Sequence, residues 1–96
     1  MSGLPVYIDI DGTLTAVGGP GGAPVLERID RVKQMIKCGV KVVIWSASGT
    51  EYARAFADRH DLHPLAVIGK PSYCIDDNPN LRPTFLVMAP DELDKR

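Results

Sequence analysis

Four aspartates form two close pairs, and each pair follows a short apolar run: Asp9 with Asp11, and Asp76 with Asp77. Ser46 ends another apolar run, and Lys70 lies in a loop shortly before the second aspartate pair. In open parallel sheets, ligands bind outside the carboxyl ends of the strands. If the apolar runs are parallel strands, all of these polar side chains meet at one edge of the sheet.

A cluster of four carboxylates needs positive charge nearby. Asp9 and Asp11 stand two residues apart along a predicted strand, so their side chains point to the same side. Two like charges about 4 Å apart repel each other by about 4 kcal/mol at an effective dielectric constant of about 20. Lys70 offers one positive charge, and a divalent cation would supply the rest. Because oxygen ligands favour a hard ion, we predict Mg²⁺ rather than Zn²⁺.

Other readings of the aspartates explain less. Aspartates often cap helices and turns, and a turn at Asp77-Asn78-Pro79 accounts for one pair. That role does not account for two pairs that converge with a lysine. An EF-hand loop that began at Asp9 would need glycine at its sixth position, where Leu14 stands. The motif Gly69-Lys70 is followed by proline, so it is not a phosphate-binding P-loop.

The elements that must position these residues are strands and helices in alternation. The apolar runs predict regular strands over residues 5–10, 40–46, 73–76 and 84–88. We interpret residues 65–68 as a short edge piece that delivers Lys70, because the few residues before Tyr73 are too short for a parallel crossover of about a dozen residues.

Two helices separate the early strands. The first starts near Pro24 and stops at Gly39. Its apolar residues recur at helical spacing and form the predicted inward face: Val25, Ile29, Val32 and Ile36. In the second, Ser48 is predicted to be the N-cap, paired with Glu51 in a capping box, and the helix fades near Asp61. Its predicted inward face is Tyr52, Ala53, Phe56 and Ala57. Residues 18–22 predict a mobile loop, and residues 90–96 a short terminal helix or frayed tail.

This order predicts a small α/β fold. We expect a single Rossmann-like domain over residues 1–96 in three layers, with helices on both faces of a parallel sheet of about four to five strands. Apolar residues at 45% and charged residues at 24% are ordinary globular values. Cys38 and Cys74 match no zinc spacing, and we expect both to be reduced in or near the core.

The composition also bounds the partners. No apolar run approaches the length of a membrane span and no signal-peptide pattern opens the chain, so we expect a cytoplasmic protein. The net charge of −1 argues against a nucleic-acid domain driven by bulk charge, which leaves nucleic acid only as a substrate. A small core and an open site allow a homodimer.

The motifs resemble those of a known family. Val6-Tyr-Ile-Asp-Ile-Asp-Gly-Thr-Leu-Thr15 resembles the first motif of the haloacid dehalogenase-like (HAD) superfamily of phosphohydrolases. Ser46 is similar to the second motif, Lys70 in Gly-Lys-Pro to the third, and Asp76-Asp77 to the fourth. All four occur in the order that the family has, and together they span residues 6–77.

The resemblance implies a Mg²⁺-dependent phosphatase that acts on phosphomonoesters through an aspartyl-phosphate. Asp9 would be the nucleophile. Asp11 would be the general acid that protonates the leaving oxygen and then activates water. Mg²⁺ would be held by Asp9, the backbone carbonyl of Asp11, and Asp76. Asp77 would ligate the ion or brace it, and which of Asp76 and Asp77 ligates directly stays open.

The resemblance also implies a phosphate site. Ser46 would hold phosphate oxygens, together with backbone N–H groups at Gly12 and Ala47 and the nearby helix N-terminus. Lys70 would neutralise the transferring phosphoryl group and orient Asp9.

This chain departs from many relatives in size, because it leaves no room for an inserted cap domain. An open, capless site suits a phosphate on a macromolecule, a pocket completed by a partner, or a loosely selected small substrate. The loop at residues 18–22 and Trp45 are the available specificity elements, although Trp45 is more typical of a core residue.

Other functions stay open beside this one. One is a polynucleotide end phosphatase, and another is a non-catalytic module that binds phosphate, metal or a partner. A phosphate-accepting receiver domain fits less well, because there the phosphorylated aspartate ends a middle strand, where this chain has Ser46.

Overall fold

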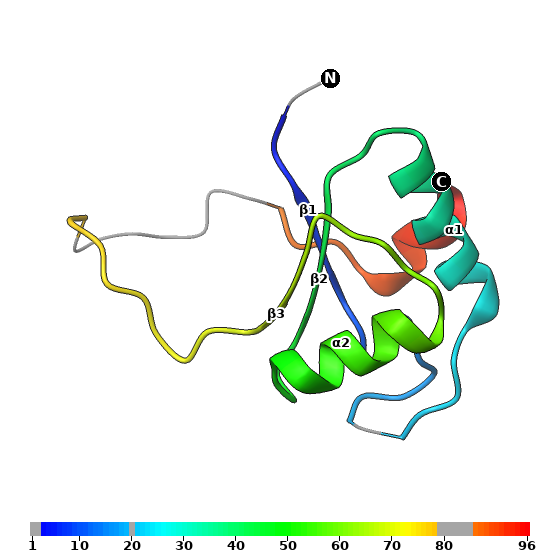
Figure 1. Ribbon diagram of the computed structural model, residues 1–96, viewed down its shortest axis with the longest axis horizontal. Coiled ribbons are helices and arrows are strands. Elements are labelled where there is room, and N and C mark those ends of the chain that lie inside the picture. Colours follow the sequence, from blue (N-terminus) through cyan, green and yellow to red (C-terminus); the bar gives the residue numbers. More distant parts are fainter. Residues whose placement is uncertain (1–2, 20, 79–85) are drawn as a thin grey trace.

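The structure is a computed structural model, and it describes residues 3–19, 21–78 and 86–96. Its elements follow in the order β1 (Val6–Asp9), α1 (Leu26–Lys37), β2 (Val42–Ser46), α2 (Thr50–Arg59), β3 (Ala66–Gly69) and a 3₁₀ helix, η1 (Pro90–Lys95) (Figure 1). The strands and helices alternate up to β3, as the hydrophobic pattern predicts.

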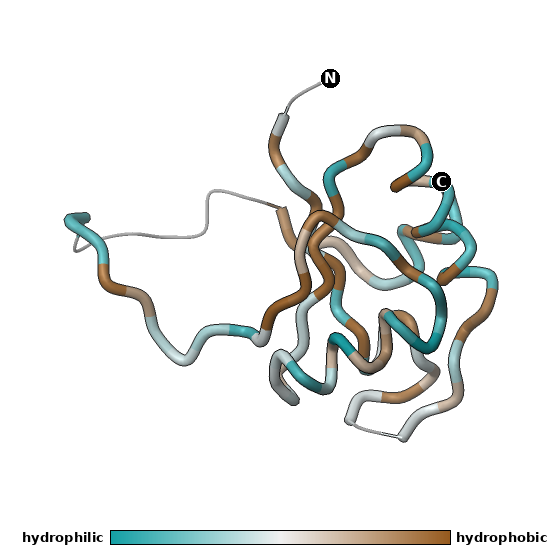
Figure 2. Tube along the Cα trace, viewed as in Figure 1, coloured by the Kyte–Doolittle hydropathy of each residue, from teal (hydrophilic) through white to brown (hydrophobic). Residues whose placement is uncertain are grey.

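The three strands form one parallel sheet in the order β1-β2-β3. The predicted strands at 5–10 and 40–46 are confirmed, with slightly narrower bounds. Residues 65–68 were expected to be only an edge piece, and they do lie at the sheet edge, as the regular strand β3. In the part of the chain that the structure describes, the sheet has three strands, not the predicted four to five. Figure 2 shows hydrophobic residues gathered along these strands.

The predicted strand at 73–76 is wrong. This segment pairs with no strand among the described residues, and Tyr73 and Ile75 are 78% and 91% exposed. The helix α2 already supplies the crossover from β2 to β3. The few residues after Gly69 cannot supply another, so the chain runs away from the sheet (Figure 1). In the predicted strand at 84–88, residues 86–88 form no strand, and residues 84 and 85 lie outside the described residues.

Both helices pack on the same face of the sheet. Ile8 and Ile44, which are paired across β1 and β2, belong to one buried cluster with Val32 of α1 and Phe56 of α2. This arrangement follows from the strand order, because successive right-handed crossovers in one direction place their helices on one side. Tyr7, on the other face, is 47% exposed. Among the described residues no helix covers that face, so the predicted third layer is not found.

The helix predictions hold in position and differ in detail. The buried residues of α1 are Ile29, Val32 and Met35, so Met35 lies deeper than the predicted Ile36. The N-cap of α2 is Gly49 rather than Ser48, with no side-chain cap hydrogen bond. Gly49 has a φ of +107°, a conformation that glycine adopts at low cost.

Two local contacts close the ends of the fold. The loop expected at residues 18–22 is closed at its base by an antiparallel bridge between Thr15 and Pro24. The expected terminal helix is η1, which Arg28 of α1 holds through Asp94 by two hydrogen bonds of 3.0 and 3.1 Å. Arg28 also donates to the Thr13 carbonyl at 3.1 Å, which ties η1 to the turn after β1.

Two further sequence predictions concern the cysteines and a membrane span. Cys38 and Cys74 are free, but both are exposed rather than in or near the core. No helix in the described residues is long and apolar enough to cross a bilayer.

Candidate active site

Asp9 and Lys70 meet at the carboxyl edge of the sheet. Asp9 is the last residue of β1, and Lys70 directly follows β3. The Lys70 ammonium crosses the end of β2, 5.5 Å from the centre of the Trp45 ring, and reaches the Asp9 carboxylate at 3.1 Å. The other Asp9 oxygen accepts a hydrogen bond from the Thr13 hydroxyl at 3.2 Å. Both oxygens of Asp9 are therefore held by neighbouring side chains.

The ion pair between Asp9 and Lys70 is partly open to water. The two side chains are 28% and 36% exposed, respectively. Pairs in such surroundings contribute about 0.2–1 kcal/mol to stability. We infer that the pair matters more for the placement of a positive charge beside a carboxylate than for the stability of the fold.

Asp11 is held by two hydroxyl groups, one from the turn before α2 and one from its first turn. The Tyr52 hydroxyl donates to one carboxylate oxygen at 2.6 Å, and the Ser48 hydroxyl donates to the other at 3.3 Å. The hydrogen bond to Asp11 raises the pKa of Tyr52 above its ordinary value of 10.0, and burial raises it further. The Tyr52 hydroxyl therefore keeps its proton at neutral pH and remains a donor to Asp11.

Ser46 lies at the end of β2, where its polar groups shape the turn. Its side chain is buried, and its hydroxyl oxygen accepts the Ser48 N–H at 3.0 Å. Its carbonyl accepts the N–H groups of Gly49 and Lys70 at 3.1 and 2.9 Å. Ser46 thus joins the end of β2 to the residue that carries the ammonium group. Ala47 is exposed in the same turn.

Gly12 lies in the turn after β1 with a φ of +85°. A side chain there would approach the Gly18 backbone nitrogen at 3.3 Å, so the turn requires glycine. Its N–H, a predicted phosphate donor, points to the Thr15 hydroxyl oxygen at 3.2 Å.

Asp76 and Asp77 are not brought to this group. Both are exposed on the segment that runs away from the sheet (Figure 1). The Asn78 N–H donates to Asp76 at 2.9 Å, and this bond lowers the pKa of the Asp76 carboxyl group. Among residues 3–19, 21–78 and 86–96, no three acidic, histidine or cysteine side chains gather where they could hold a metal ion. Of the four carboxylates that the sequence predicted to cluster, Asp9 and Asp11 lie at the sheet edge, and Asp76 and Asp77 do not.

Sequence reasoning missed three side chains of the site: Thr13, Ser48 and Tyr52. Ser48 was assigned to a helix cap and Tyr52 to the inward face of α2, but both hydroxyls point to Asp11. A signal for Tyr52 exists in retrospect, because it lies in the first turn of a helix that starts at the carboxyl edge of the sheet. Trp45, predicted as core, is half-buried on the uncovered face against Tyr7 and Lys70.

No protein-family model matches the chain, and no curated protein matches it. Among solved structures, the chain is similar to the crystal structure of an MCSG target from Vibrio cholerae. The TM-score is 0.61 and the sequence identity 16%, over 96% of this chain and 88% of that chain. At this identity the likeness concerns the fold alone, and it agrees with a small Rossmann-like parallel α/β domain.

Proposed function

We propose that the protein is a Mg²⁺-dependent phosphomonoesterase that works through an aspartyl-phosphate on Asp9. One observation carries the proposal: two carboxylates, separated by one residue, are held in different ways at the same edge of a parallel sheet. Asp9 lies beside the Lys70 ammonium, whereas Asp11 accepts hydrogen bonds from Tyr52 and Ser48. The resemblance of residues 6–15 to the first HAD motif gives the same division of roles.

In the first step, an Asp9 carboxylate oxygen attacks the phosphorus atom of the ester. The new bond joins this oxygen to phosphorus, and the bond from phosphorus to the alcohol oxygen breaks. Asp11, in its protonated form, gives its proton to that alcohol oxygen. The Lys70 ammonium, 3.1 Å from Asp9, reduces the repulsion between the carboxylate and the phosphoryl oxygens.

In the second step, water attacks the phosphorus atom of the aspartyl-phosphate. The Asp11 carboxylate, which lost its proton in the first step, now accepts a proton from that water. The bond between Asp9 and phosphorus breaks, inorganic phosphate leaves, and Asp9 and Asp11 return to their starting states. Each proton given in the first step is thus recovered in the second.

Mg²⁺ is part of the proposal, but the described residues fit it only in part. The oxygens of Asp9 and Asp11 are hard donors of the kind that Mg²⁺ takes. Asp76 and Asp77, which the sequence assigned to the same ion, lie elsewhere. Mg²⁺, when bound, would supply positive charge to the phosphoryl oxygens.

The test is phosphate release from para-nitrophenyl phosphate, with Mg²⁺ and with EDTA. Wild type should turn over only with Mg²⁺, and Asp9→Asn should lose about 10³-fold or more of the rate. Asp58→Asn is the matched control, since Asp58 is an exposed acid on α2 outside the site. Asp11→Asn should still release nitrophenol in a single burst, because that leaving group needs no proton, and then stall as the phosphorylated protein.

Two results would reject the proposal. One is turnover that survives Asp9→Asn. The other is a folded wild-type protein that releases no phosphate from any simple aryl ester, which would favour a non-catalytic binding module.

A further inference from the structure

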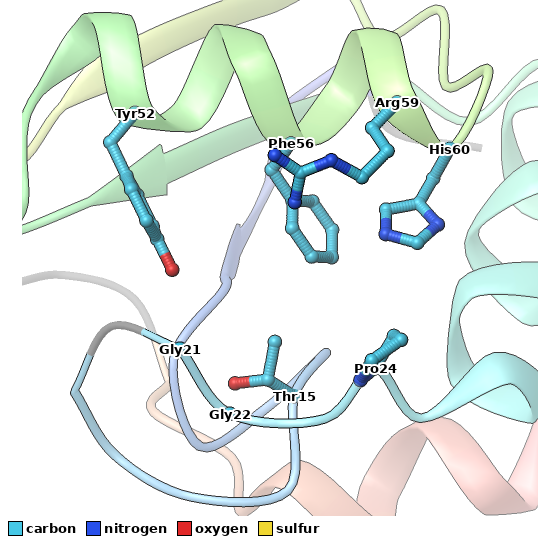
Figure 3. Close-up of a pocket in the computed structure, with 8 residues that line it drawn as sticks. All are labelled: Thr15, Gly21, Gly22, Pro24, Tyr52, Phe56, Arg59 and His60. Carbon is cyan, nitrogen blue, oxygen red and sulfur yellow. The ribbon is translucent and has the colours of Figure 1, made fainter.

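A groove of about 350 Å³ lies between α2 and the segment that leads into α1. Side chains of α2 and of His60, which directly follows it, form one wall, and Thr15, Gly21, Gly22 and Pro24 form the other. Figure 3 shows Tyr52, Phe56 and His60 pointing across the groove toward the segment that holds Thr15 and Pro24, whereas Arg59 runs along the helix. The eight lining residues come from these two elements: Thr15, Gly21, Gly22, Pro24, Tyr52, Phe56, Arg59 and His60.

The groove begins beside the hydroxyl group that holds the proposed general acid. Tyr52 lines it and also donates its hydroxyl proton to Asp11 at 2.6 Å. In the proposed reaction, Asp11 must reach the oxygen of the leaving alcohol. The alcohol therefore lies on the Asp11 side of the phosphoryl group, and the groove is the space that continues from there.

The middle of the groove offers ring surfaces. The rings of Phe56 and His60 are packed together, with centroids 4.5 Å apart and a tilt of 47°. Burial lowers the pKa of His60, and the nearby Arg59 and Lys33 lower it further, so this ring is neutral at pH 7. A neutral, ring-lined wall favours a flat apolar body over a sugar or a charged chain.

The α2 wall of the groove also carries a positive charge. Arg59 is exposed, and no carboxylate pairs with it in the described part of the chain. The Arg59 side chain runs back along α2 toward Phe56 (Figure 3), and its charge acts on the Tyr52 hydroxyl, where it partly offsets the rise in that group's pKa. A guanidinium group at that place is suited to a carboxylate or a second phosphate.

We propose that this groove binds the leaving group of the substrate, a flat ring-bearing alcohol that also carries an anionic group. The proposal rests on the proposed function, because it takes Asp11 as the proton donor. It narrows the substrate from any phosphomonoester to an anionic, ring-bearing one.

The experiment compares two esters, biphenylyl phosphate and the same compound with a carboxylate at the far para position. The two esters differ only in that negative charge. Wild type should show a kcat/KM about three- to fivefold higher for the carboxylated ester, the size expected of a partly exposed ion pair. Arg59→Gln should bring this ratio close to one, and added salt should reduce it in wild type.

Arg54→Gln is the matched control, because Arg54 is an exposed arginine on the same helix that lines a different groove. It should keep the wild-type ratio. A ratio of one in wild type, or a ratio that Arg59→Gln leaves intact, overturns the inference while the proposed function stands.

A second measurement separates this inference from the proposed function. The product alcohol, hydroxybiphenyl carboxylate, is titrated into wild type, Arg59→Gln and Arg54→Gln by calorimetry, with no turnover required. Binding should weaken about three- to fivefold in Arg59→Gln alone. If neither ester is hydrolysed, the proposed function is wrong; if the product binds equally to all three proteins, the groove assignment is wrong.

Discussion

Replacement of Tyr52 by phenylalanine tests how the protein holds its proposed acid. The change removes one oxygen, which donates to the Asp11 carboxylate at 2.6 Å, and leaves the ring in place on α2. The Ser48 hydroxyl remains as the second donor at 3.3 Å, a longer and weaker contact. We expect Asp11 to lose its fixed orientation while the fold persists.

The size of the effect follows from the bond that is lost. Asp11 is protonated, and so neutral, when it acts on the leaving oxygen, and a hydrogen bond between neutral groups contributes about 0.5–1.5 kcal/mol. If that energy orients Asp11 toward the leaving oxygen, its loss corresponds to a rate reduced by about 2- to 12-fold. The reduction should appear only where the leaving group needs a proton.

The assay compares kcat/KM for two phosphate esters. The leaving group of benzyl phosphate is an alkoxide, which needs a proton from the acid. The leaving group of para-nitrophenyl phosphate is a stable phenolate, which departs without one. Tyr52→Phe should lower kcat/KM by about 2- to 12-fold for the benzyl ester and leave kcat/KM for the nitrophenyl ester unchanged. Tyr73→Phe is the control, because Tyr73 is 78% exposed on the segment that leaves the sheet.

A merely structural role for Tyr52 gives a different pattern. Partial unfolding or a shifted helix would reduce kcat/KM for both esters by the same factor. Equal losses, or no loss for the benzyl ester, would refute the view that the hydroxyl positions Asp11.

Three further outcomes follow from the packing and the hydrogen bonds. Gly69→Ala should destabilise the protein by about 1–3 kcal/mol, because the new carbon would lie 3.2 Å from the Thr50 backbone nitrogen; urea unfolding measures this. Ile44→Val, at a fully buried position, should lower the free energy of unfolding by about 0.5–1.5 kcal/mol. Calorimetry should show this as a lower Tm, by about 4–8 °C for each kcal/mol. Ultraviolet titration should show Tyr52 ionising above the ordinary pKa of 10.0. Since the folded pKa is raised, the stability that this group adds is fully present below pH 10.0, is lost as the pH rises through the folded pKa, and is absent in Tyr52→Phe.

The sequence was sufficient to place Asp9 and Lys70 together. Parallel strands put their carboxyl ends at one edge, so a residue that ends β1 and one that follows β3 share an edge whatever the connections are. The helices were also predictable, because a buried stripe at helical spacing has few other interpretations. These rules predict where the backbone of each element lies and which side of the element is buried.

The roles of Ser48 and Tyr52 could not be predicted in the same way. A serine just before a helix can cap it or can donate to a neighbour, and the two uses have the same local sequence. Here Gly49 takes the cap position and leaves the Ser48 hydroxyl for Asp11. Tyr52 carries an apolar ring with a polar tip, so helical periodicity places the ring but says nothing of the hydroxyl.

The segment around Asp76 shows why a strand cannot be predicted from its own residues. Apolar residues favour a strand only where a partner strand accepts their backbone hydrogen bonds, and the short connection after β3 gives residues 73–76 none among the described strands. This difference changes the electrostatics of the site. Four carboxylates against one lysine would leave three negative charges without a partner, whereas Asp9 and Asp11 against Lys70 leave one. The case for a divalent ion therefore rests less on repulsion within the protein than the sequence suggested. It rests more on the charge that a phosphoryl group brings to this edge of the sheet.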